Sequence, residues 1–312
     1  MEMKDEVIYT QKLGKKYLLR RSLQKRLCKI FGPVIMTRIY YRIVNKRPLN
    51  LKDPKTFSEK ICWYKIYYCP HSQEIINCSD KFAVRAYLKK KGLDSYTNVL
   101  LGKWDLPQEI VWNDLPEKFV LKCSHGCAYN IICLDKSRLD KTTAKKNLLN
   151  WLQDDFGFYN AEYHYNKSQR VIICEKYIES QQNLPTDYKI HCMNGEPKIV
   201  LICKERGKRR GGGPRLLFYH TDKTIANVGI EETEEEFDID SELYQEMLRI
   251  CETIAEDFPF VRIDFYIDGG KLKIGELTFT PAAGLLGYLS VDGDRIMGEM
   301  LDISKIMQET TI

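Results

Sequence analysis

The chain of 312 residues is 44% hydrophobic and 29% charged, which is typical of a globular protein with a core large enough for two or three subdomains. No uninterrupted apolar run reaches the length that crosses a bilayer, and no secretory signal pattern opens the sequence. The eleven cysteines are an odd number without C-x-x-C spacing, which favours reduced thiols over a disulfide framework or a zinc site. We therefore expect a cytoplasmic protein.

The net charge of +5 is distributed unevenly along the chain. Residues 7–50 contain twelve Lys or Arg and no Asp or Glu, whereas residues 51–312 are mildly acidic overall. This excess favours an anionic partner, either a membrane surface or a lipid-linked or polyanionic substrate. Nucleic acid is not expected, because no reading motif accompanies the charge. For the basic arm at residues 7–50, peripheral association with the inner face of the cytoplasmic membrane and binding of a lipid-linked glycan are both open.

The apolar residues of this arm predict two helices. A set of apolar residues recurs at helical spacing, namely Leu19, Leu23, Leu27, Ile30 and Phe31, and a second, more apolar helix follows the break at Gly32-Pro33. The pattern favours an apolar stripe that packs on the body of the protein beside a solvated basic face. Insertion of the stripe into a membrane surface is the alternative.

The segment after the arm opens with a helix-start signal. Thr56 precedes Glu59 by three residues, which is the spacing of a capping box. A helix that buries several aromatic side chains is therefore predicted to begin after Thr56.

A strand–loop–strand pattern follows at residues 118–133. Two short apolar strands flank Ser124–Asn130, a loop of small and polar residues, and Lys122 lies on the first strand. Backbone N–H groups of such a loop can cover phosphates while the lysine adds charge. A plain hairpin is the alternative.

Two further strand regions come next. Residues 170–178 form an apolar strand that ends at Glu175-Lys176, and residues 187–203 read as a hairpin that turns at Asn194-Gly195. Residues 204–215 then hold six basic residues against one acidic residue, together with three consecutive glycines. Two interpretations of this stretch stay open. It is either a mobile basic loop that closes over phosphates or a plain surface connection.

Residues 258–281 form the most informative pattern. Apolar residues alternate with polar ones up to the turn at Asp268–Gly270, and the chain returns as a partner strand. Asp264 and Glu276 should therefore lie at or near opposite positions, where like charges repel. A cation would relieve this repulsion, and oxygen ligands suit Mg²⁺. Unrelated charges on a solvated sheet face are the alternative.

Together these stretches resemble the ATP-grasp fold, and most closely the TupA-like ATP-grasp family, which is associated with teichuronopeptide and other bacterial surface-polysaccharide biosynthesis. D-alanine–D-alanine ligases are more distantly similar. The resemblance covers roughly residue 48 onward and is carried by residues 53–60, 79–81, 122–126, 187–189 and 275–281. It implies an α+β fold in which two α/β subdomains clamp ATP. We expect a basic helical arm (1–50), an N-terminal subdomain (51–117), a small ATP-grasp subdomain (118–180) and a large one (181–312).

The resemblance implies a nucleotide site. Lys81 and Lys122 would contact the ATP phosphates, Glu175 the adenine amino group and Asp187 the ribose. The flexible loop over the phosphates would include Ser124, His125, Gly126 and Tyr129, and the adenine slot would be lined by the backbone of Lys176 and Ile178. Because this loop has a single glycine, it should be stiffer than a glycine-rich one.

The resemblance also implies the reaction centre. Asp264 and Glu276 would bind Mg²⁺, and Arg262, with Lys122, would stabilise negative charge during the reaction. Thr278 stands where the ligase pattern has a metal-binding Asn, and this weaker ligand puts two full Mg²⁺ sites in doubt. A carboxylate must be activated before an amine can attack it, and phosphoryl transfer from ATP to give an acyl phosphate would do so.

The expected activity is an ADP-producing, amide-forming carboxylate–amine ligase. Its acid would be a uronic acid of a cell-surface polysaccharide or its precursor, and its amine an amino acid. One alternative is a glycosyltransferase of the same pathway, although Asp238–Asp240 reads as a helix cap rather than a metal motif. Another is a non-catalytic nucleotide-binding scaffold.

Overall fold

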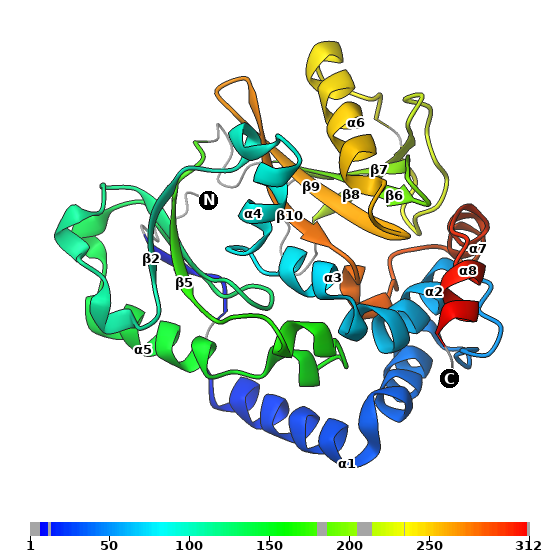
Figure 1. The fold of residues 1–312 in the computed structure, drawn as a ribbon, viewed down its shortest axis with the longest axis horizontal. Helices are drawn as coiled ribbons and strands as arrows, with labels where there is room; N and C mark the ends of the chain where they lie inside the picture. Colours follow the sequence, from blue (N-terminus) through cyan, green and yellow to red (C-terminus); the bar gives the residue numbers. More distant parts are fainter. Residues whose placement is uncertain (1–6, 12–13, 180–185, 205–213, 234, 311–312) are drawn as a thin grey trace.

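The computed structural model describes residues 7–11, 14–179, 186–204, 214–233 and 235–310. These residues form two five-stranded antiparallel sheets in different halves of the molecule, with helices around them (Figure 1). The first sheet has the strand order β1-β4-β3-β5-β2 and the second the order β10-β9-β6-β7-β8. The predicted basic loop at 204–215 lies mostly outside the described residues. The predicted boundaries at 50, 117 and 180 stay predictions.

The strands of the first sheet are β1 (Val7–Tyr9), β2 (Leu100–Trp104), β3 (Phe119–Cys123), β4 (Asn130–Cys133) and β5 (Ile172–Lys176). Those of the second are β6 (Asp187–Met193), β7 (Glu196–Lys204), β8 (Arg215–His220), β9 (Phe260–Asp268) and β10 (Lys271–Thr278). The helices are α1 (Lys15–Asn45), α2 (Phe57–Trp63), α3 (Gln73–Cys78), α4 (Val84–Lys90), α5 (Lys141–Leu152), α6 (Ser241–Ala255), α7 (Val291–Met300) and α8 (Ser304–Glu309).

Each sheet has its own hydrophobic core. Helix α5 packs on β3, where Leu148 and Trp151 join the core of the first sheet. Helix α6 packs across β6, β7 and β9 with its amphipathic face, which includes Met247, Ile250 and Ile254. Both helices are held by the burial of one apolar face, which is the usual source of helix stability in proteins.

The predicted hairpin at 258–281 is present as β9 and β10. Gly269 and Gly270 both have positive φ, which explains why glycines occupy the turn. A β-bulge between Ile274 and Glu276 shifts the register by one residue and places Glu276 opposite Asp264. A Cβ at the bulge residue, Gly275, would lie 2.4 Å from the Tyr266 ring. The bulge therefore requires a glycine at position 275, because a larger residue would clash with Tyr266.

The N-terminal arm confirms the predicted helix break and differs from the prediction in two ways. Gly32 has non-helical φ and ψ angles, so α1 consists of two helical segments joined across a kink at the predicted position. Val7–Tyr9, in contrast, is a strand that pairs with β4. The apolar stripe was predicted to pack on the body, which is wrong for most of its members. Leu19, Leu23 and Ile30 are exposed. The face toward the body is instead the one that holds Cys28, whose burial is complete.

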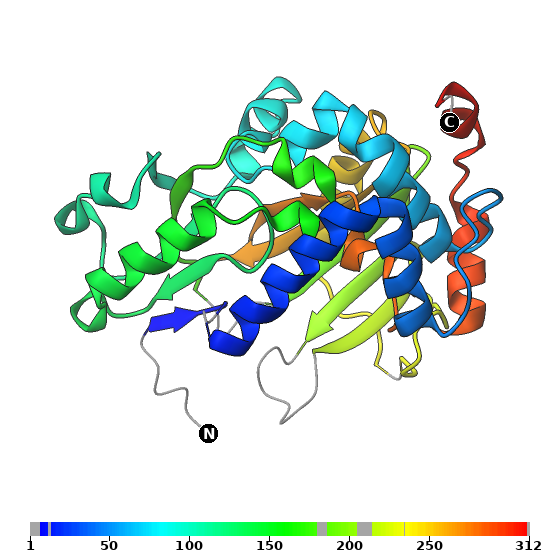
Figure 2. The ribbon, with the colours of Figure 1, turned by 90° about the horizontal axis from the view of Figure 1, so that it is seen from below.

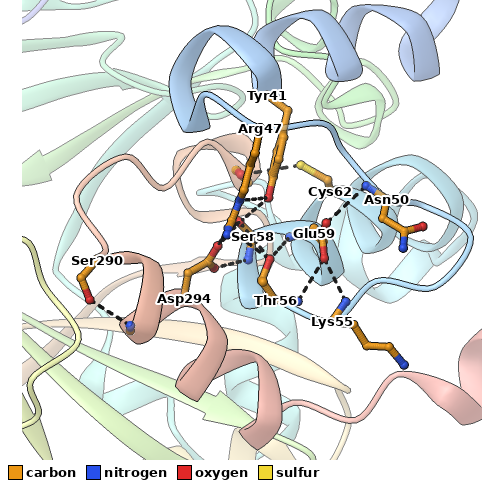
Figure 3. A network of polar contacts seen from close by, with 12 residues as sticks. Tyr41, Arg47, Asn50, Lys55, Thr56, Ser58, Glu59, Cys62, Ser290 and Asp294 are labelled. Carbon is orange, nitrogen blue, oxygen red and sulfur yellow. Dashed lines mark hydrogen bonds and ion pairs between the residues drawn. The ribbon is translucent and has the colours of Figure 1, made fainter.

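A polar network fastens the C-terminal end of α1 to α2 and α7 (Figure 3). Arg47 forms an ion pair with Asp294, whose other carboxylate oxygen accepts a 2.7 Å hydrogen bond from the Ser58 backbone N–H. At the start of α2, the predicted capping box is confirmed: the Thr56 side chain accepts from the Glu59 backbone, and the Glu59 carboxylate accepts from the Thr56 N–H at 3.1 Å. These contacts satisfy helix-end N–H groups that would otherwise lack a partner.

All eleven cysteines lie in the described residues and are free, and ten of them are buried. The prediction of reduced core thiols is confirmed. No helix in the described ranges is long and apolar enough to cross a membrane.

Candidate active site

A pocket of about 170 Å³ lies between the two sheets. We call it the inter-sheet pocket. The first sheet and the chain after β5 supply most of its lining, and Tyr266 of β9 closes it from the second sheet. Three of the predicted site residues line this pocket, namely Lys122, Lys176 and Ile178. Its walls also include Val120 and Ile132, so it combines apolar faces with two lysines.

Lys122 and Glu175 form an ion pair beside this pocket. The Lys122 Nζ lies 2.6 Å from one oxygen of Glu175, and Arg85 lies 3.3 Å from the other. Burial by itself raises the pKa of Glu175, but the charge and hydrogen bond of Lys122, together with the charge of Arg85 and a hydrogen bond from Asn98, outweigh burial, and the net result is a lowered pKa. The Lys122 ammonium is thus held in place by a carboxylate that stays ionised.

The backbone at Lys176 is tied to the segment before β2. Its N–H donates to the Val99 carbonyl at 3.0 Å, and its carbonyl accepts from the Asn98 side chain at 2.8 Å. The backbone at the rim of the inter-sheet pocket is therefore fixed by one hydrogen bond to another backbone group and one to the Asn98 side chain.

The predicted phosphate loop is firmly anchored by its side chains. Ser124, His125 and Tyr129 are buried, and the Ser124 hydroxyl donates to the Gln169 carbonyl at 2.9 Å. Burial, aided by the charge of Arg170, lowers the pKa of His125 to about 4. These three side chains face the core rather than a ligand, so any contact of the loop with phosphates falls to its backbone.

The tip of this loop meets Lys81. The Lys81 ammonium donates to the Gly126 carbonyl at 2.5 Å, and its backbone N–H donates to the Ser124 carbonyl at 2.9 Å. Gly126 has φ of 68°, and a Cβ there would lie 2.9 Å from the Phe156 ring. The structure thus brings Lys81 and the loop together, as the sequence predicts.

The β9–β10 hairpin carries a buried charge cluster. Asp264 is 1% exposed and accepts hydrogen bonds from Arg262 at 2.6 and 2.8 Å. It also pairs with Lys189 of β6, which lies 3.1 Å from Asp187. Burial by itself raises the pKa of Asp264, but Arg262 and Lys189 prevail and hold the pKa at about 2. Asp187 therefore belongs to the same charge cluster as Asp264.

Glu276 and Thr278 lie on the open side of this cluster. The Glu276 side chain is 40% exposed and lies 3.6 Å from Arg262. The Thr278 hydroxyl accepts from Arg262 at 3.2 Å and donates to Glu276 at 3.4 Å. Arg262 thus contacts each of the three predicted metal ligands.

The oxygen atoms of Asp264, Glu276 and Thr278 suit a metal ion that is also coordinated by phosphate oxygens. In the part of the chain that the structure describes, no group of three or more His, Cys, Asp or Glu side chains could hold a metal ion. Two carboxylates and one hydroxyl do fit Mg²⁺, because this ion keeps several waters and binds through one or two carboxylates together with substrate phosphates. Glu276 is the accessible ligand, whereas Asp264 would have to exchange part of its ion pairing for the metal.

A second pocket, of about 300 Å³, opens beside this hairpin. We call it the hairpin pocket. Its lining includes Arg262, Glu276 and Thr278, the loop residue Gly126, and Arg21 of helix α1. The Arg21 guanidinium stacks 3.7 Å above the Tyr159 ring, which fixes its position. The pocket therefore presents two guanidinium groups, one from the arm and one from the hairpin.

Sequence reasoning missed four charged residues of the two pockets and their surroundings. Lys189 is two residues from Asp187 on one strand, so period-two spacing could have placed both on the same face. Arg21 was counted only as part of the basic arm. Neither Arg85 nor Glu162, a buried carboxylate that accepts from Thr280 at 2.6 Å, carries a sequence signal, because tertiary packing brings them in.

Comparison with known proteins places this arrangement in a family. The model of the TupA-like ATP-grasp family matches residues 59–302. The chain belongs to this family, so the predictions of an ATP-grasp fold and of an ATP-grasp ligase are confirmed at the family level. A search of curated proteins finds no match.

Several solved structures are similar to the chain at low sequence identity. A D-alanine–D-alanine ligase from Bacillus anthracis complexed with ATP is 13% identical with a TM-score of 0.44, over 75% of this chain and 68% of that one. An L-amino acid ligase from Bacillus licheniformis is 14% identical with a TM-score of 0.42, over 68% of this chain and 45% of that one. A D-alanine–D-alanine ligase from Helicobacter pylori is 15% identical with a TM-score of 0.41, over 79% and 67%.

Proposed function

We propose that the protein is an ATP- and Mg²⁺-dependent ligase that joins a carboxylate to an amine and releases ADP. The observation that carries this proposal is the pairing of two pockets. One lies between the sheets and holds Lys122, and the other holds Arg262 and Glu276 beside the loop that Lys81 contacts. A nucleotide in the first pocket would extend its phosphates toward this loop.

In this proposal the inter-sheet pocket takes the adenine. The backbone around Lys176 and Ile178 would edge the ring, Tyr266 would cover one side of it, and Glu175 would meet its amino group. Asp187 would hold the ribose, which requires it to share its charge with Lys189. Lys81 and Lys122 would neutralise the phosphates.

The hairpin would hold the metal through Glu276, Asp264 and Thr278. Bound Mg²⁺ would neutralise phosphate charge during phosphoryl transfer. Arg262 would stabilise the negative charge that develops on the reacting acyl group, since a guanidinium that is already oriented by Asp264 needs no reorganisation. Phosphoryl transfer to the acid would give an acyl phosphate, which the amine then attacks.

The hairpin pocket would take the acid. Arg21 and Arg262 both line it, and a guanidinium group suits a carboxylate because its donors match the two oxygens. We propose that this acid is a uronic acid of a bacterial cell-surface polysaccharide or of its precursor, and that the amine is an amino acid. The support is the association of the TupA-like family with such polysaccharides, and we place the reaction in the cytoplasm, where ATP is available.

The test measures ADP release with pooled amino acids and glucuronate- or galacturonate-containing glycans. ADP formed only when acid and amine are both present is the expected result. ATP binding without turnover under any pairing would favour a non-catalytic scaffold. A glycosyltransferase gains no support, because Asp240 caps α6 by accepting from the Glu242 and Leu243 N–H groups at 3.0 Å each.

A further inference from the structure

Helix α1 presents an apolar face to solvent. Leu19, Ile30 and Ile43 are 73%, 72% and 59% exposed. The outward face of α1, as we define it, consists of Leu19, Leu23, Ile30, Phe31, Ile35, Ile39 and Ile43, all of which are exposed. In Figure 2 the first segment of this helix runs diagonally across the side of the molecule that faces the viewer, and the second segment turns away from that line after the kink. Seven exposed apolar side chains along the two segments of one kinked helix exceed the scattered single ones that are normal at a protein surface, and they favour an interaction site.

The opposite face of α1 is fixed to the body along its length. Cys28 and Met36 are buried, Lys25 forms a 2.5 Å ion pair with Asp155, and Tyr41 hydrogen-bonds to Ser58 at 3.0 Å. The helix therefore does not rotate to bury its outward face without breaking these contacts. The outward face is therefore uncovered by the residues that the structure describes and is accessible to a partner.

The charge around the outward face identifies this partner. Helix α1 carries nine Lys or Arg and no acidic residue. Arg26, Arg38 and Arg42 are exposed close to the apolar side chains. A second copy of the chain would bring two such cationic faces together, whereas an anionic lipid surface offers negative headgroups above an apolar interior.

We propose that the outward face of α1 binds the surface of a bilayer that contains anionic phospholipid. The apolar side chains enter the boundary between headgroups and acyl chains, and the flanking arginines contact lipid phosphates. The helix lies in the plane of the interface and not across it.

The position of Arg21 connects this surface with the hairpin pocket. Arg21 lies on the body side of the same helix and lines that pocket. A membrane-bound α1 therefore places the pocket next to the lipid surface, where a lipid-linked acceptor would be presented. This last step rests on the proposed function, whereas the membrane binding itself does not.

The test is co-sedimentation of the full chain with vesicles of phosphatidylcholine alone or with added phosphatidylglycerol. We expect binding only to the anionic vesicles and weaker binding at high salt. The variant Arg26→Gln/Arg38→Gln/Arg42→Gln should lose roughly a hundredfold in affinity, from three charges near the lipid surface. Its matched control is Lys89→Gln/Lys141→Gln/Lys271→Gln, three exposed lysines elsewhere. This control should bind like the wild type.

The apolar part has its own pair of variants. Leu23→Gln/Ile30→Gln/Ile39→Gln should weaken binding strongly, and Leu106→Gln/Val111→Gln/Val291→Gln, exposed residues away from α1, should not. Thermal unfolding verifies that each variant is folded. The proposal is overturned if the wild type ignores anionic vesicles, if controls and α1 variants lose binding equally, or if sedimentation shows a dimer that only the α1 variants dissociate. This assay measures membrane binding and not ligase activity. A failure of the membrane proposal is therefore distinguishable from a failure of the proposed function.

Discussion

The charge cluster on the hairpin predicts that two substitutions of predicted metal ligands behave differently. Asp264→Asn removes a carboxylate that is 1% exposed and paired with both Arg262 and Lys189. Glu276→Gln removes one that is 40% exposed and 3.6 Å from Arg262. Both variants should lose Mg²⁺-dependent ATP turnover, but only Asp264→Asn should also lose substantial stability.

The magnitude follows from the surroundings of Asp264. Its pKa falls from 3.8 to about 2, which corresponds to about 2 kcal/mol of stability at neutral pH. The substitution Asp264→Asn also removes the carboxylate that pairs with the buried cations of Arg262 and Lys189. Breaking a buried ion pair lowers the free energy of unfolding by about 3–5 kcal/mol. Because Lys189 retains Asp187, we expect a loss of about 3 kcal/mol, at the lower end of this range. Glu276→Gln should cost less than about 1 kcal/mol, as for a surface pair.

Urea unfolding at neutral pH measures both variants against the wild type. The pKa of Asp264 is lowered in the folded state, so its contribution is complete above pH 3.8 and is lost as the pH falls toward 2. The difference between wild type and Asp264→Asn should therefore shrink in acid. An Asp264→Asn variant as stable as Glu276→Gln would refute this reasoning.

Three further predictions concern other parts of the molecule. Thr56→Ala removes the side-chain half of the capping box and should lower the free energy of unfolding by about 1 kcal/mol, measured in urea; no change would contradict the cap. His125 has a folded-state pKa of about 4 against 6.5, so the neutral form is favoured on folding and stability should decline by up to about 3 kcal/mol as the pH falls from 6.5 to 4. A His125→Phe variant without a flatter stability–pH profile would argue against this. Arg21→Gln should raise the KM for the acid roughly tenfold or more and leave ATP affinity unchanged, whereas the exposed neighbour Arg20→Gln should change neither. An equal rise in KM for both substitutions would indicate that the overall positive charge of the arm, and not a specific contact of Arg21 with the acid, is responsible.

The hairpin was predictable from sequence because its signals are local. Alternation of apolar residues and the Gly269-Gly270 turn fix the strands, and the register follows from the turn except at the bulge. Opposition of Asp264 and Glu276 was therefore predicted correctly. The capping box at Thr56 was equally local, since three residues of spacing decide it.

The features that the sequence did not reveal depend on contacts between distant segments. Nothing near Glu162 indicates that Thr280 would bond to it, and Lys189 joins Asp264 only because β6 pairs with β9. Helical spacing showed that α1 has an apolar stripe but not which face the body covers, so the predicted packing of Leu19 was wrong. The resemblance implies a flexible phosphate loop, yet Ser124, His125 and Tyr129 are buried, which agrees with the stiffness expected from its single glycine.

The most direct test of the proposed function is calorimetric titration of ATP with Mg²⁺, followed by ADP release with acid and amine. The wild type should bind ATP and release ADP only with both substrates. Lys122→Met should lose binding, whereas Lys118→Met, an exposed lysine that precedes the same strand and pairs with Glu179, should bind normally. Absence of ATP binding by the wild type, or equal binding by the two variants, would contradict the account.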